Sequence, residues 1–342
     1  MNKVERSITR DDVAREAGVS PATVSYVINN GPRPVSPETR QRVMVAIEKL
    51  GYKPNVVARS LRMRKTTTLG LILPDTHNPY FAEVIRGVEK VAYERGYSVV
   101  LCHSDYSSER EVHYADVLQS RRVAGVLWFP ATVEMKPAEL LTSYGVPLVM
   151  LDRMMKGVEV PVVLANNYRG GYLAVKHLIE LGHRRIGCIA RPVDLYHSSE
   201  RVRGYTAALQ ENGLAVEEGY IIRGGFQLED GRRAAFNLLN LEKKPTAIFA
   251  YNDFMAIGAM RACFEMGLSV PGEISIVGFD DIPQAAYTCP ALTTVRQPKL
   301  EMGRRGAELL FNLIEGNMGE GVSPPLLDIE LIVRESTGKM KG

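Results

Sequence analysis

The first fifty residues carry hydrophobic positions at helical spacing. Apolar side chains within residues 13–17 form one small face, and those within residues 24–28 form a second face that can pack against it. Gly18 lies between the two segments and supplies the left-handed conformation that ends a helix. Two short helices joined by such a turn predict a helix-turn-helix, whose second helix fits the major groove of DNA. A helical hairpin inside an ordinary protein core is the alternative that this stretch leaves open.

Each expected helix of this region has its own start signal. Thr9 can cap the first helix and receive a hydrogen bond from Asp12, which makes a capping box. Ser20-Pro21 opens the second helix, and Ser36-Pro37 opens a third by the same combination of cap and proline. The buried stripe expected for the third helix consists of Val43, Ala46, Ile47 and Leu50.

From Thr68 onward, short apolar runs alternate with amphipathic helices, among them Phe81–Arg95, Gly170–Leu181, Asp230–Leu241 and Met255–Met266. The runs expected to be strands are Leu69–Leu73, Ser98–Cys102, Gly125–Phe129, Leu148–Leu151, Val162–Ala165, Arg185–Ala190, Tyr220–Arg223, Ala247–Ala250 and Ile274–Gly278. Apolar strands separated by helices indicate an α/β fold with parallel sheets covered on both faces. The series before and after about Asn166 predict two similar doubly wound subdomains. Val295–Pro298 and Leu326–Arg334 would cross back between them.

Polar residues gather where these strands end. In parallel sheets, ligands bind beyond the carboxyl ends of the strands, so a shared cleft is the hypothesis that explains all of them together. Any one of them alone is better explained as a helix cap or a loop residue. The residues at the strand ends are Asp75, Asp152-Arg153, Asn166, Asn252-Asp253 and Asp280-Asp281.

Composition is that of a globular protein of two or three domains, with 342 residues and 45% hydrophobic content. No apolar run approaches the ~20 residues of a membrane span, and residues 1–6 lack the apolar core of a secretory signal. The four cysteines are scattered, which favours reduced thiols in the cytoplasm. Residues 1–65 hold 13 Lys and Arg and 6 Asp and Glu, which gives a net charge of +7. The remaining residues hold 29 Lys and Arg and 33 Asp and Glu, which gives a net charge of −4. A basic head on a mildly acidic body indicates nucleic-acid contact confined to the head.

The segment Gly51–Leu61, with the sequence GYKPNVVARSL, resembles the lactose-repressor/galactose-repressor family of bacterial transcription factors. The resemblance extends from about Thr9 to Thr337. In the body it is similar to the family's effector domain, which looks like periplasmic sugar-binding proteins. The matching body motifs are Asp75–Phe81, Asp152-Arg153, Pro245–Asp253, Ile274–Asp281 and Pro290–Pro298.

The resemblance implies a headpiece over residues 1–54, a hinge helix over 55–66 and an effector-binding and dimerisation domain over 67–342. Within the last, the N-subdomain would comprise about 67–165 and 296–322, and the C-subdomain about 166–292 and 323–340. Family base contacts fall on Pro21, Ala22 and Tyr26, where Tyr replaces a common Arg, and Leu61 would be a minor-groove wedge. The DNA-contacting residues implied in this way are Thr9, Ser20, Pro21, Ala22, Thr23, Ser25, Tyr26, Asn29, Asn55, Ala58, Arg59, Leu61 and Arg62.

By the same resemblance, Tyr80 and Phe81 would stack on a ligand, and Phe226 would close its other side. Asp280 and Arg201 would hydrogen-bond ligand hydroxyls or ring atoms. A core aromatic remains the alternative for Phe226, and a salt bridge at a helix start for Arg201. The effector residues implied are Asp75, Tyr80, Phe81, Asp152, Arg153, Asn166, Arg201, Phe226, Asn252 and Asp280, with Asn166 departing from the Asp of many members.

The sequence thus predicts a cytoplasmic repressor that binds a palindromic operator as a homodimer under control of a small polar effector, most simply a sugar or sugar derivative. No heptad repeat follows Arg334, so we expect a dimer rather than a tetramer. A transport-type sugar-binding protein and an enzyme are the competing classes. The basic head and absent signal peptide disfavour the first, while no P-loop, dinucleotide fingerprint or metal-ligand spacing supports the second. We therefore expect no catalytic residue, cofactor, metal or membrane partner. The sequence leaves open which effector binds and whether it promotes or releases operator binding.

Overall fold

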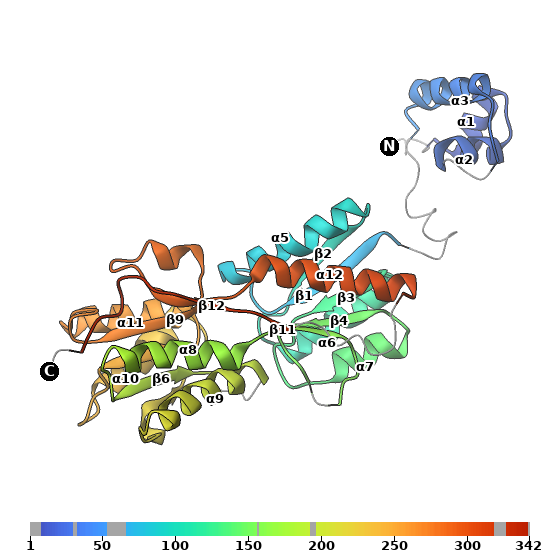
Figure 1. Ribbon diagram of the computed structural model, residues 1–342. Helices are drawn as coiled ribbons and strands as arrows, with labels where there is room; N and C mark the ends of the chain where they lie inside the picture. The colour runs from blue at the N-terminus through green and yellow to red at the C-terminus, as the bar shows by residue number, and fades with distance from the viewer. Residues whose placement is uncertain are drawn as a thin grey trace, which may run out of the picture. The chain divides into compact units, whose positions relative to one another are not determined.

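The computed structural model describes residues 8–29, 33–52, 66–155, 157–191, 196–317 and 326–340, with the backbone alone at 29 and 196–198 (Figure 1). The chain divides into two compact units, one ending at Thr66 and one beginning at Thr67. The hinge expected over residues 55–66 lies outside the described residues, apart from Thr66.

The first unit is built from α1 (Arg10–Ala17), α2 (Pro21–Asn29) and α3 (Pro37–Leu50). The predicted capping box is present, because Thr9 Oγ1 accepts from the Asp12 backbone N–H at 3.3 Å and Asp12 Oδ2 accepts from the Thr9 N–H at 3.0 Å. Gly18, at φ 63°, ends α1 as expected. The three helices enclose a small apolar core made by Val13, Ala14, Ala17, Val24, Val27, Val43 and Ala46. Because this core is small, the unit depends on every member of it.

The first half of the second unit is a parallel sheet in the order β11-β5-β4-β3-β1-β2. Its strands are β1 (Thr68–Leu73), β2 (Ser98–His103), β3 (Gly125–Trp128), β4 (Leu148–Leu151), β5 (Val162–Ala165) and β11 (Leu326–Leu327). Leu71 and Leu127 share a core with α5 (Pro79–Glu94) and α12 (Lys299–Glu315). Ile72 and Trp128 point the opposite way and share a core with α6 (Ser108–Ser120) and α7 (Lys136–Ser143). The sheet is therefore covered on both faces.

The other half is a sheet in the order β12-β10-β9-β8-β6-β7, parallel except for the β10–β12 pair. Its strands are β6 (Ile186–Ala190), β7 (Ile221–Arg223), β8 (Ala247–Ala250), β9 (Ser275–Asp280), β10 (Thr293–Arg296) and β12 (Glu330–Ile332). Its helices pack in two pairs, α8 (Asn167–Glu180) with α9 (Tyr196–Glu211), and α10 (Leu228–Leu239) with α11 (Asp253–Glu265). On β9 the Cα of Gly278 faces Ala256 of α11, while the neighbouring Phe279 contacts Gly170 of α8. Successive strand residues face opposite sides, so the two pairs cover opposite faces. The predicted fold class is confirmed.

Both runs predicted to connect the two halves do so, although the strands within them start and stop at other residues than predicted. The run expected at Val295–Pro298 is β10, which begins earlier and pairs within the second sheet. The run expected at Leu326–Arg334 splits, with β11 in the first sheet and β12 in the second. The subdomain boundaries expected at 296 and 323 are therefore shifted by a few residues. The reason is that Thr293 and Thr294 are polar yet fully buried, so an apolar run cannot reveal the start of β10.

Helices α5 and α12 touch backbone to backbone. A Cβ added at Gly87 would lie 2.2 Å from the Leu300 carbonyl oxygen, and one added at Gly303 would lie 2.0 Å from that of Val84. Only glycine permits this approach. The contact fixes the amino-terminal end of α12 beside the carboxyl ends of the strands.

His183 ties the last described residues of the chain to the second sheet. Its side chain is buried, with Nδ1 at 2.9 Å from Thr246 Oγ1 and Nε2 at 2.9 Å from Ser275 Oγ. Nε2 also donates to the Gly338 carbonyl oxygen at 3.1 Å. Burial lowers the pKa of His183 below its ordinary value of 6.5, so the fold favours the neutral ring.

A pH dependence of stability follows from this depressed pKa. The contribution of His183 is fully present above its unfolded-state pKa, and it is lost as the pH falls below that value, because the unfolded chain then binds the proton more readily. Urea unfolding of the full chain between about pH 7.5 and about pH 5.5 should show stability falling more steeply in wild type than in His183→Asn. His177 remains in both proteins, with its pKa lowered by burial and, in wild type, also by the nearby His183. Equal pH slopes would contradict the assignment.

Candidate functional site

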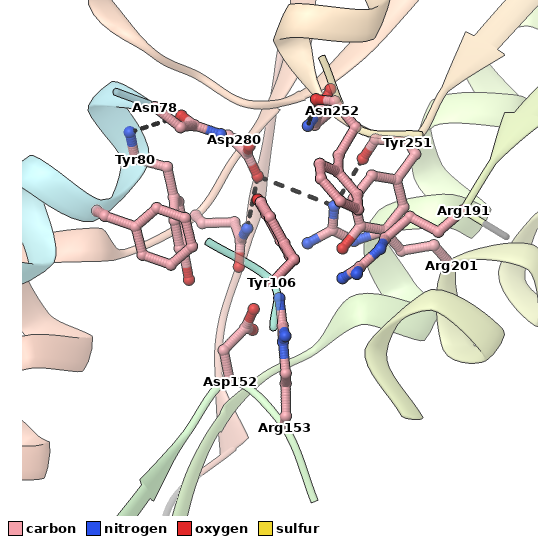
Figure 2. Close-up of a pocket in the computed structure, with 13 residues that line it drawn as sticks. Asn78, Tyr80, Tyr106, Asp152, Arg153, Arg191, Arg201, Tyr251, Asn252 and Asp280 are labelled. Carbon is pink, nitrogen blue, oxygen red and sulfur yellow. Dashed lines mark hydrogen bonds and ion pairs between the residues drawn. The ribbon is translucent and has the colours of Figure 1, made fainter. Parts of the chain in front are cut away.

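A cavity of about 30 Å³ lies in the second unit between its two sheets (Figure 2). Every lining residue except Arg201, which lies within α9 (Tyr196–Glu211), comes at the carboxyl end of a strand or in the segment that follows it, which is the position that parallel sheets reserve for ligands. The lining residues are Asn78, Tyr80, Phe81, Tyr106, Asp152, Arg153, Arg191, Arg201, Phe226, Tyr251, Asn252, Asp280 and Gln297.

Aromatic rings form two walls of the cavity. On one side, Tyr80 and Phe81 begin α5 directly after its cap Asn78, whose Oδ1 accepts from the Tyr80 N–H at 2.9 Å. Their ring centroids lie 5.0 Å apart in an edge-on arrangement, and the Tyr80 hydroxyl donates to the Met302 sulfur at 3.3 Å. Phe226 lines the cavity from the other sheet. Aromatic side chains suit a ligand with apolar faces.

Arg201 is the most heavily engaged charged residue of the cavity. Its Nε donates to Asn167 Oδ1 at 2.8 Å, and its Nη1 donates to the Tyr251 carbonyl oxygen at 2.6 Å. Its guanidinium lies over the Phe279 ring at 3.7 Å from the centroid and 3.9 Å from Asp280 Oδ1. Figure 2 shows Arg201 and Asp280 directed toward each other. The guanidinium is thus held rigidly, with its charge facing the cavity.

Asp280 ends β9 with a left-handed backbone at φ 115°. Its Oδ1 accepts from Gln297 Nε2 at 2.7 Å, and the Lys299 ammonium donates to the carbonyl oxygens of Asp280 and Asp281 at 2.5 and 2.7 Å. Burial raises the pKa of Asp280 to about 6, against the opposing effect of Arg201. Lysine at the start of α12 opposes the helix dipole. The two carbonyl contacts compensate for this by tying the helix to the strained strand end.

Asp152 and Arg153 follow β4 at the other side of the cavity. Burial raises the pKa of Asp152, and burial together with the nearby Arg191 lowers the pKa of Arg153. Arg153 Nη1 donates to the Pro130 carbonyl oxygen. Within the described part of the chain, Asp152 Oδ1, Arg153 Nε and Gln297 Oε1 are buried without a hydrogen-bond partner. Unpaired buried polar atoms are costly, so these three are available to a ligand.

Eight of the ten predicted effector residues line the cavity, but Asp75 and Asn166 do not. Asp75 Oδ2 accepts from Gln227 Nε2 at 3.1 Å, which links the two halves of the unit. Asn166 caps α8, because its Oδ1 accepts from the Arg169 N–H at 3.0 Å. Asn252 lines the cavity while also donating to the Phe226 carbonyl oxygen at 3.1 Å. The sequence did not identify five lining residues, Asn78, Tyr106, Arg191, Tyr251 and Gln297, although all of them follow strands.

The predicted DNA-contacting residues of the first unit lie at the N-cap of α1 and along α2 with its preceding Ser20. Ala22 is exposed, and Pro21, Thr23, Ser25 and Tyr26 are half-buried. The exposed Ser20 caps the helix, with its Oγ accepting from the Thr23 N–H at 3.1 Å, and Thr9 is exposed within its capping box. The side chain of Asn29 is not described. Asn55, Ala58, Arg59, Leu61 and Arg62 lie outside the described residues.

Neither a metal centre nor a membrane-spanning helix emerges from the parts of the chain described above. No group of three or more His, Cys, Asp and Glu side chains among those residues is arranged to hold a metal ion. No helix among them has the length and apolar character needed to cross a bilayer.

Comparison with known proteins gives matches along nearly the whole chain. Residues 9–55 match the family described as bacterial regulatory proteins, lacI family, and residues 175–337 match a periplasmic binding protein-like domain. The chain is 41% identical over 308 residues to the HTH-type transcriptional repressor PurR of Proteus mirabilis, covering 90% of each. It resembles the lac repressor dimer bound to operator and the anti-inducer ONPF at a TM-score of 0.86 and 29% identity, covering 97% of this chain and 100% of that one. A complex of the transcriptional regulator CelR with cellobiose matches at a TM-score of 0.74 and 36% identity, covering 96% of this chain and 99% of that one.

Proposed function

Because the chain belongs to the lacI family of bacterial regulatory proteins, we propose that it represses transcription by binding a near-palindromic operator as a homodimer. The family consists of regulators rather than enzymes. Residues 1–54 serve as the headpiece, 55–66 as the hinge and 67–342 as the effector-binding and dimerisation domain. The protein acts in the cytoplasm, where its operator is found.

The effector in this proposal is a small polar molecule, a sugar or sugar derivative. The observation that carries it is the set of unpartnered buried atoms on Asp152, Arg153 and Gln297. A sugar hydroxyl can donate to the two oxygens and accept from the guanidinium nitrogen, so a polyol satisfies all three. The rings of Tyr80 and Phe81, which line the cavity, suit the C–H face of a sugar. A related regulator has been solved with cellobiose.

Effector binding reaches the headpiece through the relative movement of the two subdomains. Asp280 contacts Gln297 directly, and its backbone is tied to Lys299 at the start of α12. Helix α12 packs closely on α5, and both helices belong to the subdomain opposite the one that holds Asp280. A ligand that changes the position of Asp280 therefore shifts α12 and α5 together, and coupling of this kind amounts to about 1–3 kcal/mol.

The test begins with a thermal-shift screen of the full chain against neutral sugars, sugar phosphates and purines. Operator is selected from a random duplex pool, and its affinity is then measured with and without any stabilising compound. We expect a sugar to stabilise the protein and to alter operator affinity. Stabilisation by purines alone would show that the effector is a purine rather than a sugar. Failure to select any duplex would refute the regulatory function itself.

The homodimer would form through the edge of the first sheet. Strand β2 lies at that edge, and edge strands carry unpaired backbone groups that a second chain can pair with or cover. Leu101 on β2 is 44% exposed and Tyr93 on α5 is 84% exposed, which leaves an apolar surface for a second copy.

Leu101→Asp should convert the dimer to a monomer, because a charge would be buried at the centre of the interface. We expect the dissociation constant of the dimer to rise by about 100-fold or more. Light scattering of the eluted protein measures the mass directly. Tyr144→Asp, at a 61% exposed position on α7's end, is the matched control and should remain dimeric. A monomeric wild type, or a dimeric Leu101→Asp, would contradict this interface.

A further inference from the structure

The outer end of the cavity is closed by contacts between the two subdomains. Tyr106, in the turn after β2, stacks on Phe226 with centroids 3.6 Å apart and ring planes at 25°. The Arg191 guanidinium lies 5.6 Å from the Tyr106 centroid and 4.8 Å from that of Phe226. Beside the stack, Gln227 donates to Asp75 across the same gap. Figure 2 shows Tyr106 among the side chains that surround the cavity.

These contacts leave little room for a ligand. A cavity of about 30 Å³ holds on the order of one water molecule, whereas small-molecule sites occupy roughly 300–1,000 Å³. The effector therefore enters only when the subdomains move apart or when a lining side chain moves.

The unsatisfied polar atoms belong to buried side chains of the cavity. Asp152 and Arg153 are 4% exposed and Gln297 is 2% exposed. The hydroxyls of a first sugar ring find partners on these atoms. A ligand large enough to reach the face of Phe226 must displace Tyr106, which already covers it.

Tyr106 is held where it is by its ring contacts, since its backbone is not in a relaxed conformation. Asp105 and Tyr106 both have left-handed backbones, with φ of 52° and 55°. Non-glycine residues persist there only when their surroundings hold them. The Phe226 stack and Arg191 supply that restraint.

We infer that Tyr106 determines effector size: it covers the Phe226 face and restricts the site to a sugar of one ring. This inference rests on the proposed sugar class of the effector. The same fold accommodates cellobiose, a two-ring sugar, in a related regulator, so the restriction comes from particular side chains rather than from the architecture.

Titration calorimetry of the full chain tests this with the common aldopentoses and aldohexoses, and with cellobiose and maltose as two-ring probes. Wild type and Tyr106→Phe, which keeps the ring, should bind a monosaccharide and discriminate against both disaccharides. Tyr106→Ala should improve disaccharide affinity relative to monosaccharide by about tenfold, the order of magnitude of one aromatic stack. Tyr144→Ala, which removes an exposed Tyr away from the cavity, should match wild type.

Three results would overturn the inference. The first is wild-type binding of a disaccharide as tightly as any monosaccharide. The second is an unchanged affinity ratio in Tyr106→Ala. The third is failure of every sugar to bind either protein, which would also remove the sugar class. In that last case, operator titration distinguishes failure of the sugar proposal from failure of the proposed regulatory function. Selective duplex binding would leave the regulatory function in place.

Discussion

Replacing Arg201 should abolish the response of operator binding to effector. Arg201 contacts Asn167, Tyr251 and Asp280, and its guanidinium is held over Phe279. Arg201 is a buried charge with two hydrogen bonds and an ion pair to Asp280 at 3.9 Å, and truncating such a group costs about 2–5 kcal/mol of binding energy, so effector affinity should fall by about 100-fold or more. Operator affinity should then be the same with and without effector at the concentration that saturates wild type.

Two variants separate this effect from simple loss of folding. Arg201→Met leaves Asp280 buried without its partner, which costs about 3–5 kcal/mol of stability. Arg201→Lys keeps the charge but loses the planar fork that reaches two acceptors at once, so it should fold and still bind effector weakly. Arg203→Met, on the same helix with an exposed ion pair to Glu200, is the control and should behave as wild type. A wild-type response from Arg201→Lys would contradict the assigned role.

Val24→Asp should eliminate operator binding and leave effector binding nearly unchanged. Val24 is fully buried in the small core of the first unit. An unpaired carboxylate there costs several kcal/mol, comparable to the whole stability of so small a domain. The effector cavity belongs to the second unit, which has its own core.

The matched control is Val45→Asp, which makes the same chemical change at a position that is 51% exposed on α3. Surface substitutions of this kind usually change stability by about 0.5 kcal/mol or less. Operator titration and effector calorimetry are run on each protein. If Val24→Asp bound operator within tenfold of Val45→Asp, the headpiece would not be the DNA-binding unit, since a tenfold change is only about 1.4 kcal/mol.

Local signals in the sequence predicted the elements well. The capping box of Thr9 and Asp12 involves residues three apart, and the apolar strands stand out because both faces of each sheet are covered. The polar residues that follow the predicted strands included Asp152, Arg153, Asn252 and Asp280, because parallel strands bring their carboxyl ends together. Tyr80 and Arg201 came only from the family resemblance.

What the sequence could not show depends on pairings between distant residues. Nothing local indicates that Asp75 meets Gln227, or that Tyr106 stacks on Phe226 across the two subdomains. Arg191 and Gln297 follow β6 and β10 directly, so the strand-end rule would have included them if it had been applied to every polar residue. The start of β10 was hidden because Thr294 is buried through a hydrogen bond to Asp253, which polarity alone does not reveal.

The proposed regulation depends on a free-energy coupling between the cavity and the operator-binding head. Operator affinity of the full chain, measured at one fixed salt concentration with and without saturating effector, tests that coupling most directly. We expect a change of about 5–150-fold, with effector affinity changing by the same factor when operator is bound. Equal operator affinity in the two titrations, with a ligand shown by calorimetry to occupy the cavity, would contradict it.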